Sequence, residues 1–129
     1  MYGDHPKVSG VLVCCDEEEN VERCLQSLTW ADEIIVVDSF SRDKTVELCR
    51  KYTDKIFQRE WSGMVEQRTY AVSLARNEWV FVIDADEVVT ERLRDEVLTR
   101  LSEDKNEKSR RWLEWSSVFN PANYFTPVT

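Results

Sequence analysis

The run EIIVV at residues 33–37 is the feature that most restricts how this chain can fold. Four of its five residues are apolar and β-branched, so the run predicts a strand buried on both faces. Other apolar runs alternate with stretches of helical periodicity. We expect strands at 7–15, 33–37, 55–58 and 79–83, and helices at 17–28, 42–52, 62–76 and 90–101. This alternation predicts parallel βαβ units, and therefore an α/β fold with helices on both faces of a sheet.

Apolar spacing at i, i+3, i+4 and i+7 indicates that the helices are amphipathic. Ser62 and Thr90 stand where the last two helices begin, so we expect their hydroxyl groups to act as N-caps. The residues expected to face the sheet are Val21, Cys24, Leu25 and Leu28 in the first helix, and Leu93, Val97, Leu98 and Leu101 in the last.

The size and charge of the chain restrict its class. Its 129 residues suit one domain, 1–129, in which 8–101 form the core and 102–129 form a charged linker and an aromatic tail. The formal net charge is −8, and it lies in residues 1–90, with 18 acidic against 10 basic residues. We therefore expect no nucleic acid partner. No apolar run reaches the ~18 residues of a membrane span, and no signal pattern opens the sequence.

The cysteines do not have the spacing of a metal site. No CxxC pair is present, and His5 is the only histidine, so a zinc site is not expected. The simpler interpretation is a set of buried free thiols in a reducing compartment. The four cysteines are Cys14, Cys15, Cys24 and Cys49.

Aspartates follow three of the four expected strands. Asp16 follows the first strand, Asp38 the second, and Asp84 and Asp86 the fourth. Ligands of open α/β sheets bind outside the carboxyl ends of the strands, so these residues predict a binding site at one edge. A preference of Asp for turns and caps would explain Asp16 and Asp38. It explains Asp84 and Asp86 poorly, because Asp84 directly continues the apolar run WVFVI.

The acids in WVFVIDADEVVT require a positive partner. Three acids occupy four successive positions, 84 to 87, and like charges about 4 Å apart repel by roughly 4 kcal/mol at a surface-like dielectric. Arg68 is the candidate for this positive partner. It lies on the same helical stripe as Ala71, Val72 and Ala75, and as Met64 one turn earlier, so its side chain is expected to face inward. A guanidinium group on that face needs an anion or a carboxylate. The alternative is an arginine at the margin of the stripe that reaches out to water.

Two long segments resemble the N-terminal half of a family 2 glycosyltransferase. They are VLVCCDEEENVERCLQSLTWADEIIVVDSFSRDKTVELCRKY and QREWSGMVEQRTYAVSLARNEWVFVIDADEVVT. The nearest group is the bacterial enzymes that extend lipopolysaccharide core, and the resemblance covers 8–101. It implies a GT-A (Rossmann-like) fold, a three-layer sandwich with a mainly parallel central sheet. It also implies a nucleotide-diphosphate sugar donor, most simply a UDP-sugar, with Mn²⁺ or Mg²⁺, and inverting transfer to a glycan or lipid-linked acceptor. The expected location is the cytoplasm, including the inner membrane surface as a peripheral protein.

The resemblance also implies a role for each residue of the site. Asp38 would hydrogen-bond the base, and Arg68 would lie by the nucleotide. Asp84 would touch the ribose or the metal, and Asp86 of the DxD motif would ligate the metal that bridges the two phosphates. Hard cations of this kind take one or two carboxylates plus substrate phosphates, and the metal neutralises the leaving diphosphate.

The chain departs from the family after the first strand. The family commonly has Thr, then an aromatic residue or Lys, then Asn–Glu, where this chain has Cys14, Cys15, Asp16 and Glu17. We still expect Asp16 and Glu17 to bind substrate. The aromatic residue that would stack on the base is missing, which weakens or changes the expected binding of the nucleotide.

Length is the larger departure. Family members continue for a hundred residues or more beyond the DxD motif, with the acceptor site and the general base, whereas 39 residues follow Thr90 here. Glu114 is the only acid in 111–129, and we do not expect it to be the base, which stays unknown. We therefore expect a fragment, a truncated gene product, or a donor-binding module that needs a partner. We expect the aromatic tail from Trp112 to Phe125 to cover the sheet, as an edge strand or a covering segment, or to form a homodimer contact.

Three alternative functions would place the chain in a different class of protein. FVIDADEVV fits the motif of haloacid-dehalogenase-like phosphatases, but that motif normally opens the domain. A receiver domain would use Asp16 and Glu17 for Mg²⁺, but its phosphoacceptor follows the third strand, and KIFQRE contains no Asp. A non-catalytic module for nucleotide-sugar binding or assembly stays open, and turnover of a nucleotide sugar would separate it from an enzyme.

Overall fold

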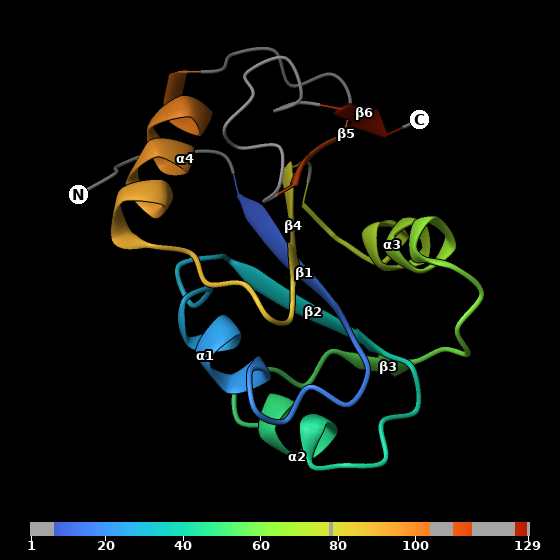
Figure 1. The fold of residues 1–129 in the computed structure, drawn as a ribbon. Coiled ribbons are helices and arrows are strands. Elements are labelled where there is room, and N and C mark those ends of the chain that lie inside the picture. Colours follow the sequence, from blue (N-terminus) through green and yellow to red (C-terminus); the bar gives the residue numbers. More distant parts are fainter. Residues whose placement is uncertain (1–6, 78, 104–109, 115–125, 129) are drawn as a thin grey trace.

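The computed structural model describes residues 7–77, 79–103, 110–114 and 126–128, and these residues form a six-stranded sheet in the order β3-β2-β1-β4-β5-β6 (Figure 1). The strands are β1 (Val8–Cys14), β2 (Glu33–Asp38), β3 (Ile56–Gln58), β4 (Trp79–Asp84), β5 (Arg110–Glu114) and β6 (Thr126–Val128). Neighbouring strands are parallel, except that β6 is antiparallel to β5. The predicted, mainly parallel α/β sheet is confirmed.

The helices cover both faces of the sheet. They are α1 (Val21–Gln26), α2 (Thr45–Cys49), α3 (Met64–Ser73) and α4 (Glu91–Glu103). Figure 1 shows α1, α2 and α4 on one face and α3 on the other, which gives the three layers that were predicted. Both α1 and α2 are shorter than predicted. Before α1, the amide groups of Asn20 and Val21 both donate to the carbonyl group of Glu17, at 3.0 and 2.8 Å, so these residues form a turn instead of helix.

Each central strand sends alternate side chains to two separate cores, as the pleat of a strand requires. In β4, Trp79, Phe81 and Ile83 pack with α1, α2 and α4, whereas Val80 and Val82 pack against α3. All five side chains are at most 2% exposed. The continuous apolar runs in the sequence are therefore explained by a sheet that is covered on both sides.

Gly10 allows the chain after α1 to approach the sheet closely. A Cβ atom at Gly10 would lie 2.7 Å from Cδ2 of Leu28, well inside van der Waals contact. Leu28 is fully buried, so a larger residue at position 10 would push the end of the α1 segment away from β1.

Of the two predicted helix N-caps, one is confirmed and the other is wrong. Thr90 caps α4, because its Oγ1 accepts a hydrogen bond from the amide group of Leu93 at 3.1 Å. The prediction for Ser62 is wrong, since Gly63 occupies the N-cap position of α3 with φ +124°. That backbone conformation favours glycine, so the glycine determines where α3 begins.

The predicted inward stripe of α3 is partly wrong. Ala71, Val72 and Ala75 are buried as expected, but Met64 is 43% exposed. Gln67, which was not assigned to the stripe, is fully buried.

The cysteines are all free, and Cys14, Cys24 and Cys49 are buried as predicted. Cys15 is exposed, so the prediction of a buried thiol is wrong there. The end of β1 turns this side chain out of the sheet.

The residues that the structure describes include only part of the aromatic tail. Trp112 lies in β5, beside β4, whereas residues 115–125 lie outside the described part of the chain, as does the predicted covering or homodimer contact of the tail. None of the described helices is long and apolar enough to cross a membrane.

Candidate functional site

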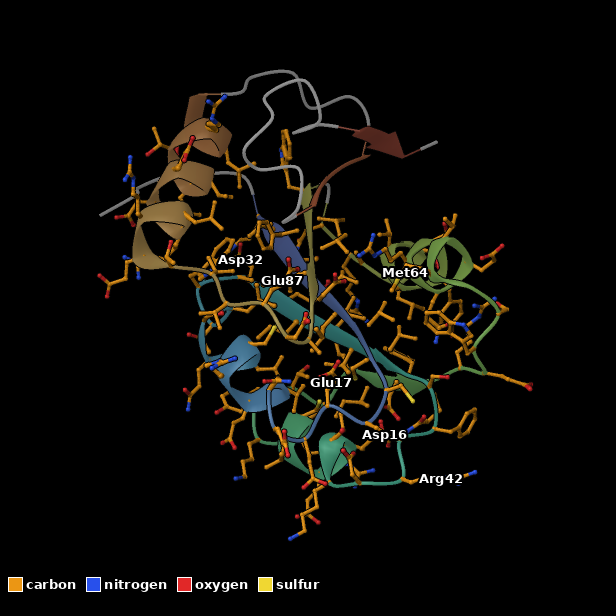
Figure 2. The ribbon with its side chains drawn as sticks, in the orientation of Figure 1. Asp16, Glu17, Asp32, Arg42, Met64 and Glu87 are labelled. Carbon is orange, nitrogen blue, oxygen red and sulfur yellow. The ribbon has the colours of Figure 1, made fainter. Side chains whose placement is uncertain are left out.

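The carboxyl ends of three strands lie at one edge of the sheet. Cys14 at the end of β1 pairs with Asp38 of β2, and Val13 pairs with Asp84 of β4. Asp16 and Asp86 lie in the loops that leave β1 and β4 at this edge, and Figure 2 shows Asp16 in the first of these loops. The four predicted aspartates therefore share one edge, as the parallel order of the strands requires.

Asp38 is the last residue of β2, and it forms hydrogen bonds with the loop that follows. Its side chain is fully buried, and its carboxylate accepts hydrogen bonds from the amide group of Ser41 at 2.8 Å, from the Ser41 hydroxyl group and from the Cys14 thiol group. In this structure Asp38 orders its own loop. Its predicted contact with a base stays a prediction.

Asp16 joins the β1 loop to the β2 loop. It adopts a left-handed conformation, with φ +52°. Its carboxylate accepts a hydrogen bond from the amide group of Arg42 at 2.7 Å, and its own amide group donates to the Ser41 hydroxyl group at 2.7 Å. The two loops therefore form one hydrogen-bonded unit, and Figure 2 shows Asp16 and Arg42 on the two loops.

Glu17 and its neighbour continue this connection. The amide group of Glu17 donates to Oγ1 of Thr45 at 2.8 Å, and the amide group of Glu18 donates to Asp43 at 3.1 Å. Desolvation raises the pKa of Asp43, but hydrogen bonds from Thr45 and Glu18 outweigh it, so the pKa lies below its usual value. The side chain of Glu17 accepts from Asn20 at 3.2 Å, so Glu17 also supports the start of α1.

Arg68 is paired with the first acid after β4. Its Nη2 atom lies 2.7 Å from Oδ1 of Asp84, and the two side chains are 22% and 36% exposed. The prediction that an inward Arg68 needs a carboxylate partner is confirmed. The pair brings a positive charge from α3 to the carboxyl edge.

The other two acids of the cluster, Asp86 and Glu87, lie close to Asp84, and their negative charges are less well compensated. Oε1 of Glu87 accepts a hydrogen bond from the amide group of Asp84 at 2.9 Å. Asp86 is exposed, and no described residue donates a hydrogen bond to its carboxylate. Desolvation, together with the charges of Asp84 and Asp86, raises the pKa of Glu87, even though the Asp84 amide group and Arg68 act in the opposite direction. The cluster therefore favours a bound cation or proton.

A cavity of about 290 Å³ is lined by two acids of this cluster, Asp84 and Asp86. One part of its wall comes from β1, β4 and the loops that follow them, and the other part comes from Trp61 and Met64 at the start of α3. The lining residues are Val13, Cys14, Cys15, Glu17, Trp61, Met64, Asp84, Ala85 and Asp86. Sequence reasoning did not identify Glu87 or Trp61 as site residues. The signal for Trp61 was a large aromatic residue directly before the Ser–Gly that begins α3.

The donor atoms fit a hard divalent cation only in part. Asp84 and Asp86 offer carboxylate oxygens, the ligands that Mn²⁺ and Mg²⁺ take in proteins. Within residues 7–77 and 79–102, no group of three His, Cys, Asp or Glu side chains is arranged to hold a metal ion. The carboxylates therefore fit a site that is completed by oxygen ligands from a bound substrate.

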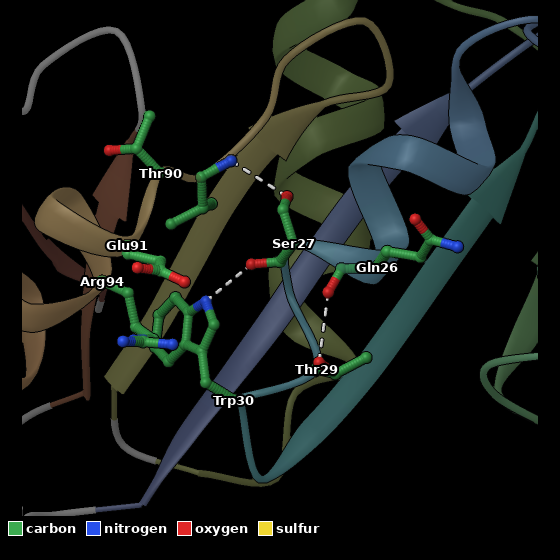
Figure 3. A pocket seen from close by; sticks show the side chains of 8 residues that line it. Gln26, Ser27, Thr29, Trp30, Thr90, Glu91 and Arg94 are labelled. Carbon is green, nitrogen blue, oxygen red and sulfur yellow. Dashed lines mark hydrogen bonds between the residues drawn. The ribbon is translucent and has the colours of Figure 1, made fainter.

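A larger cavity, of about 430 Å³, lies on the helical face where the end of α1 meets the start of α4 (Figure 3). Its polar groups join the two segments. Ser27 Oγ accepts from the Val89 amide group at 2.9 Å, and Trp30 Nε1 donates to the Ser27 carbonyl group at 2.8 Å. The Trp30 ring packs edge-on against Phe81, with ring centres 5.5 Å apart. This cavity has no cluster of acids, and we interpret it as a packing seam.

Comparison with known proteins agrees with this geometry. The family described as Glycosyl transferase family 2 matches residues 9–108. An uncharacterized glycosyltransferase of Rickettsia conorii is 40% identical over 92 residues, which are 70% of this chain and 33% of that protein. The lipopolysaccharide core biosynthesis glycosyltransferase LpsC of Rhizobium meliloti is 33% identical over 93 residues, which are 68% of this chain and 34% of LpsC. The chain thus spans about a third of the length of these relatives.

Solved structures show the same fold. TarS of S. aureus superposes with a TM-score of 0.60 at 29% identity, over 70% of this chain and 31% of TarS. Glucosyl-3-phosphoglycerate synthase of Mycobacterium tuberculosis, solved with Mn²⁺, UDP and glucosyl-3-phosphoglycerate, has a TM-score of 0.56 at 25% identity, over 62% of this chain and 33% of the synthase. The family match at 9–108 includes β2, β3, β4 and nearly all of β1, the strands that carry the acidic edge. The chain belongs to glycosyl transferase family 2, and its sheet and helices have the GT-A fold.

Proposed function

We propose that this chain is the donor-binding part of a glycosyltransferase that takes a nucleotide-diphosphate sugar, with UDP as the nucleotide, through a divalent metal. The observation that carries the proposal is the pair Asp84 and Asp86 at a cavity on the carboxyl edge of a GT-A sheet, with Glu87 beside them. UDP bound to the synthase and to TarS in their solved structures supports the choice of nucleotide.

Asp86 and Asp84 would hold Mn²⁺ or Mg²⁺. Bound there, the cation would neutralise the diphosphate as it leaves the anomeric carbon of the sugar. Arg68 holds Asp84 in place through the 2.7 Å contact, and it adds a positive charge beside the expected diphosphate. Without a cation, the acids would repel a diphosphate.

The joined loops after β1 and β2 would hold the nucleoside. Asp16 and Glu17 anchor the first loop through their hydrogen bonds to residues 41–45, and Asp38 orders the second. We assign all three to substrate binding, with Asp38 acting on the base through the shape of its loop or through a direct hydrogen bond.

The transfer we propose is inverting. An acceptor hydroxyl group attacks the anomeric carbon, the bond from that carbon to the diphosphate breaks, and a base takes the hydroxyl proton. We assign no residue of this chain as that base. The name of LpsC supports a glycan or lipid acceptor of the cell envelope, and such an acceptor would suit a cytoplasmic protein at the inner membrane surface.

The second candidate is a module that binds nucleotide sugars without turnover. Such a module would use the same acidic edge and the same joined loops, because binding of a nucleotide diphosphate requires no catalytic base. Release of free sugar or transfer to an acceptor, with consumption of the donor, would distinguish the enzyme from the module.

A thermal-shift panel tests the proposal. UDP-, GDP-, ADP- and CMP-sugars are compared with and without Mn²⁺, with EDTA as the metal-free control. We expect the UDP-sugars to raise the melting temperature in Mn²⁺ and to have little effect in EDTA. The CMP-sugars, which have one phosphate group, should have a smaller effect. Equal stabilisation by UDP-sugars in EDTA, or none in either condition, would contradict the proposal.

A further inference from the structure

Trp61 is an aromatic residue at the cavity, and the proposed function assigns it no role. Its side chain is 50% exposed, and it lines the cavity together with Asp84 and Asp86. Tryptophan is highly buried on average, so a half-exposed ring at a cavity offers a large apolar surface that a ligand can cover. On the side of β1, the cavity is lined by Val13, Cys14 and Cys15, none of which is aromatic.

The loop that carries Trp61 is held firmly at its start. Nη1 of Arg59 donates to Oε1 of Gln67 at 2.9 Å, and Nε2 of Gln67 donates back to the Arg59 carbonyl group at 3.1 Å. Gln67 is fully buried. The guanidinium group of Arg59 also lies 4.9 Å from the centre of the Tyr70 ring, within the range of a cation–π contact.

Both ends of the loop are fixed. At its start, directly after β3, the amide group of Arg59 donates to the carbonyl group of Asp38 at the end of β2, at 3.0 Å. Gly63, with φ +124°, turns the chain into α3. Trp61 therefore stands between two anchored points, and little conformational entropy is lost when a ligand packs against it.

The cavity has two chemically different parts. Its acids suit a metal–diphosphate group, whereas Trp61 and Met64 offer apolar, polarizable surface. A nucleotide diphosphate has the same two parts, a charged diphosphate and a flat base. Stacking on an aromatic side chain is sequence-tolerant and contributes affinity for any base. A volume of about 290 Å³ is at the lower end for small-molecule sites, so the cavity suits part of a nucleotide sugar.

We infer that Trp61 stacks on the base of the nucleotide, with Met64 beside it. This inference rests on the proposed function. It assigns the aromatic surface of the donor site to the loop between β3 and α3.

The neighbouring residue Val65 provides a matched control. It is 73% exposed and does not line the cavity. If an apolar surface were needed only for contact with another protein, Val65 and Trp61 would be equivalent, and neither change would affect a small ligand. Trp61→Phe keeps an aromatic ring and serves as the conservative variant.

Isothermal calorimetry in Mn²⁺ with two probes tests the inference. UDP carries a base, whereas pyrophosphate has only the charged part. We expect Trp61→Ala to weaken UDP binding at least about fivefold and to leave pyrophosphate binding unchanged. Trp61→Phe should retain UDP affinity within about twofold, and Val65→Ala should match the wild type. UDP should also quench part of the tryptophan fluorescence of the wild type, and this quenching should be lost in Trp61→Phe.

The outcomes separate this inference from the proposed function. If the wild type binds UDP and Trp61→Ala binds it equally well, the stacking role is wrong and the donor-site proposal stands. If Trp61→Ala weakens UDP and pyrophosphate equally, Trp61 shapes the site without stacking, and the inference is again wrong. If the wild type does not bind UDP in Mn²⁺, the proposed function fails together with the inference. Because fluorescence quenching in Trp61→Phe is independent of the alanine variant, the test holds even if Trp61→Ala folds poorly.

Discussion

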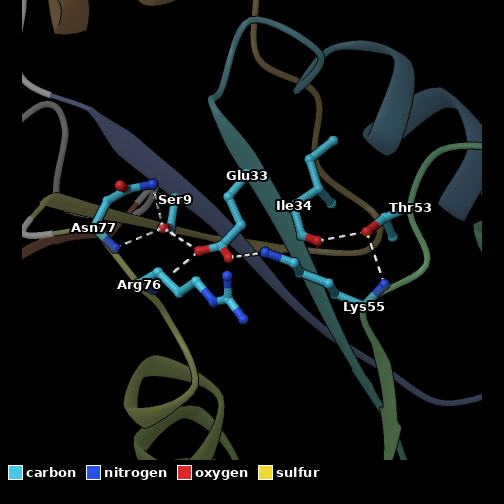
Figure 4. A network of polar contacts seen from close by, with 7 residues as sticks. All are labelled: Ser9, Glu33, Ile34, Thr53, Lys55, Arg76 and Asn77. Atoms are coloured by element: carbon cyan, nitrogen blue, oxygen red, sulfur yellow. Dashed lines mark hydrogen bonds and ion pairs between the residues drawn. The ribbon is translucent and has the colours of Figure 1, made fainter.

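The two ends of the sheet carry carboxylates in opposite electrostatic conditions. At the amino end, Glu33 is 9% exposed and accepts hydrogen bonds from Ser9 Oγ at 2.6 Å, from the Arg76 amide group at 3.0 Å, and from Lys55 Nζ (Figure 4). At the carboxyl end, Asp84, Asp86 and Glu87 crowd together, and Arg68 binds one of them.

The pKa values of the two ends shift in opposite directions. For Glu33, desolvation raises the pKa, but hydrogen bonds from Arg76, Lys55 and Ser9 outweigh it and lower the pKa below the ordinary value. For Glu87, desolvation and two neighbouring carboxylates raise it. The ionised acid is thus stabilised by the fold at one end and disfavoured at the other. The difference separates an acid that stabilises the fold from acids whose charges are only partly compensated among the described residues.

The largest expected effect concerns the amino end. Glu33→Ala removes the acceptor of three donors near the start of the sheet, and we expect it to lower the free energy of unfolding by about 2–3 kcal/mol. Glu33→Gln retains one carbonyl oxygen and should cost less. Urea unfolding measures both. A loss below about 0.5 kcal/mol for the alanine variant would show that this network contributes little.

The next effect concerns the carboxyl end. Asp86→Asn keeps the shape of the side chain but removes a charge, so it should weaken Mn²⁺-dependent UDP binding at least tenfold, about 1.4 kcal/mol. Asp54→Asn makes the same change at an exposed position near the other end and should have no effect. Calorimetry with and without Mn²⁺ measures both variants. If wild-type UDP binding is equal in EDTA, or if Asp86→Asn binds normally, the cluster is not a metal site.

The pH dependence of stability should also separate the two ends. Because the pKa of Glu87 is raised above its ordinary 4.5, the folded state holds that proton more tightly, and stability should fall as the pH rises from about 4.5 through the raised pKa. Glu33 has a lowered pKa, so its contribution is present above about 4.5 and is lost as the pH falls through its folded pKa.

Chemical denaturation between pH 3 and 8 in EDTA tests these signs. Glu87→Gln should flatten the decline above about pH 4.5, and Mn²⁺ should reduce it in the wild type. Glu33→Gln should flatten the loss at lower pH. A steeper decline above pH 4.5 in Glu87→Gln would contradict the assignment of Glu87 to an uncompensated cluster.

The smallest expected effect concerns Cys15. Desolvation and then the charges of Asp16 and Asp38 raise the pKa of this thiol, so its alkylation should be slow at pH 7.5 although it is exposed. Asp16→Asn keeps an acceptor for Arg42 and removes a charge, which should speed alkylation about two- to threefold. Iodoacetamide kinetics followed by mass spectrometry would show this. An unchanged rate would show that the charge of Asp16 does not act on Cys15.

The sequence by itself was sufficient for the layers of the fold and for the edge that carries the site. Periodicity is a local property, so the apolar runs at 33–37 and 79–83 identified β2 and β4. Parallel connection then required Asp38 and Asp84 to lie at the same edge. The inward stripe of α3 also predicted that Arg68 would need a carboxylate, which is Asp84.

Only the tertiary structure decided which side chains of the edge reach the cavity. The loops after β1 and β2 join through hydrogen bonds between residues 25 to 28 positions apart, such as Asp16 with Ser41 and Glu17 with Thr45. No local pattern encodes such contacts, because they depend on β1 lying between β2 and β4. For the same reason the burial of Gln67, the place of Trp61 at the cavity and the raised pKa of Glu87 follow from packing across the chain, since each depends on charges or surfaces that come together only after the strands have paired.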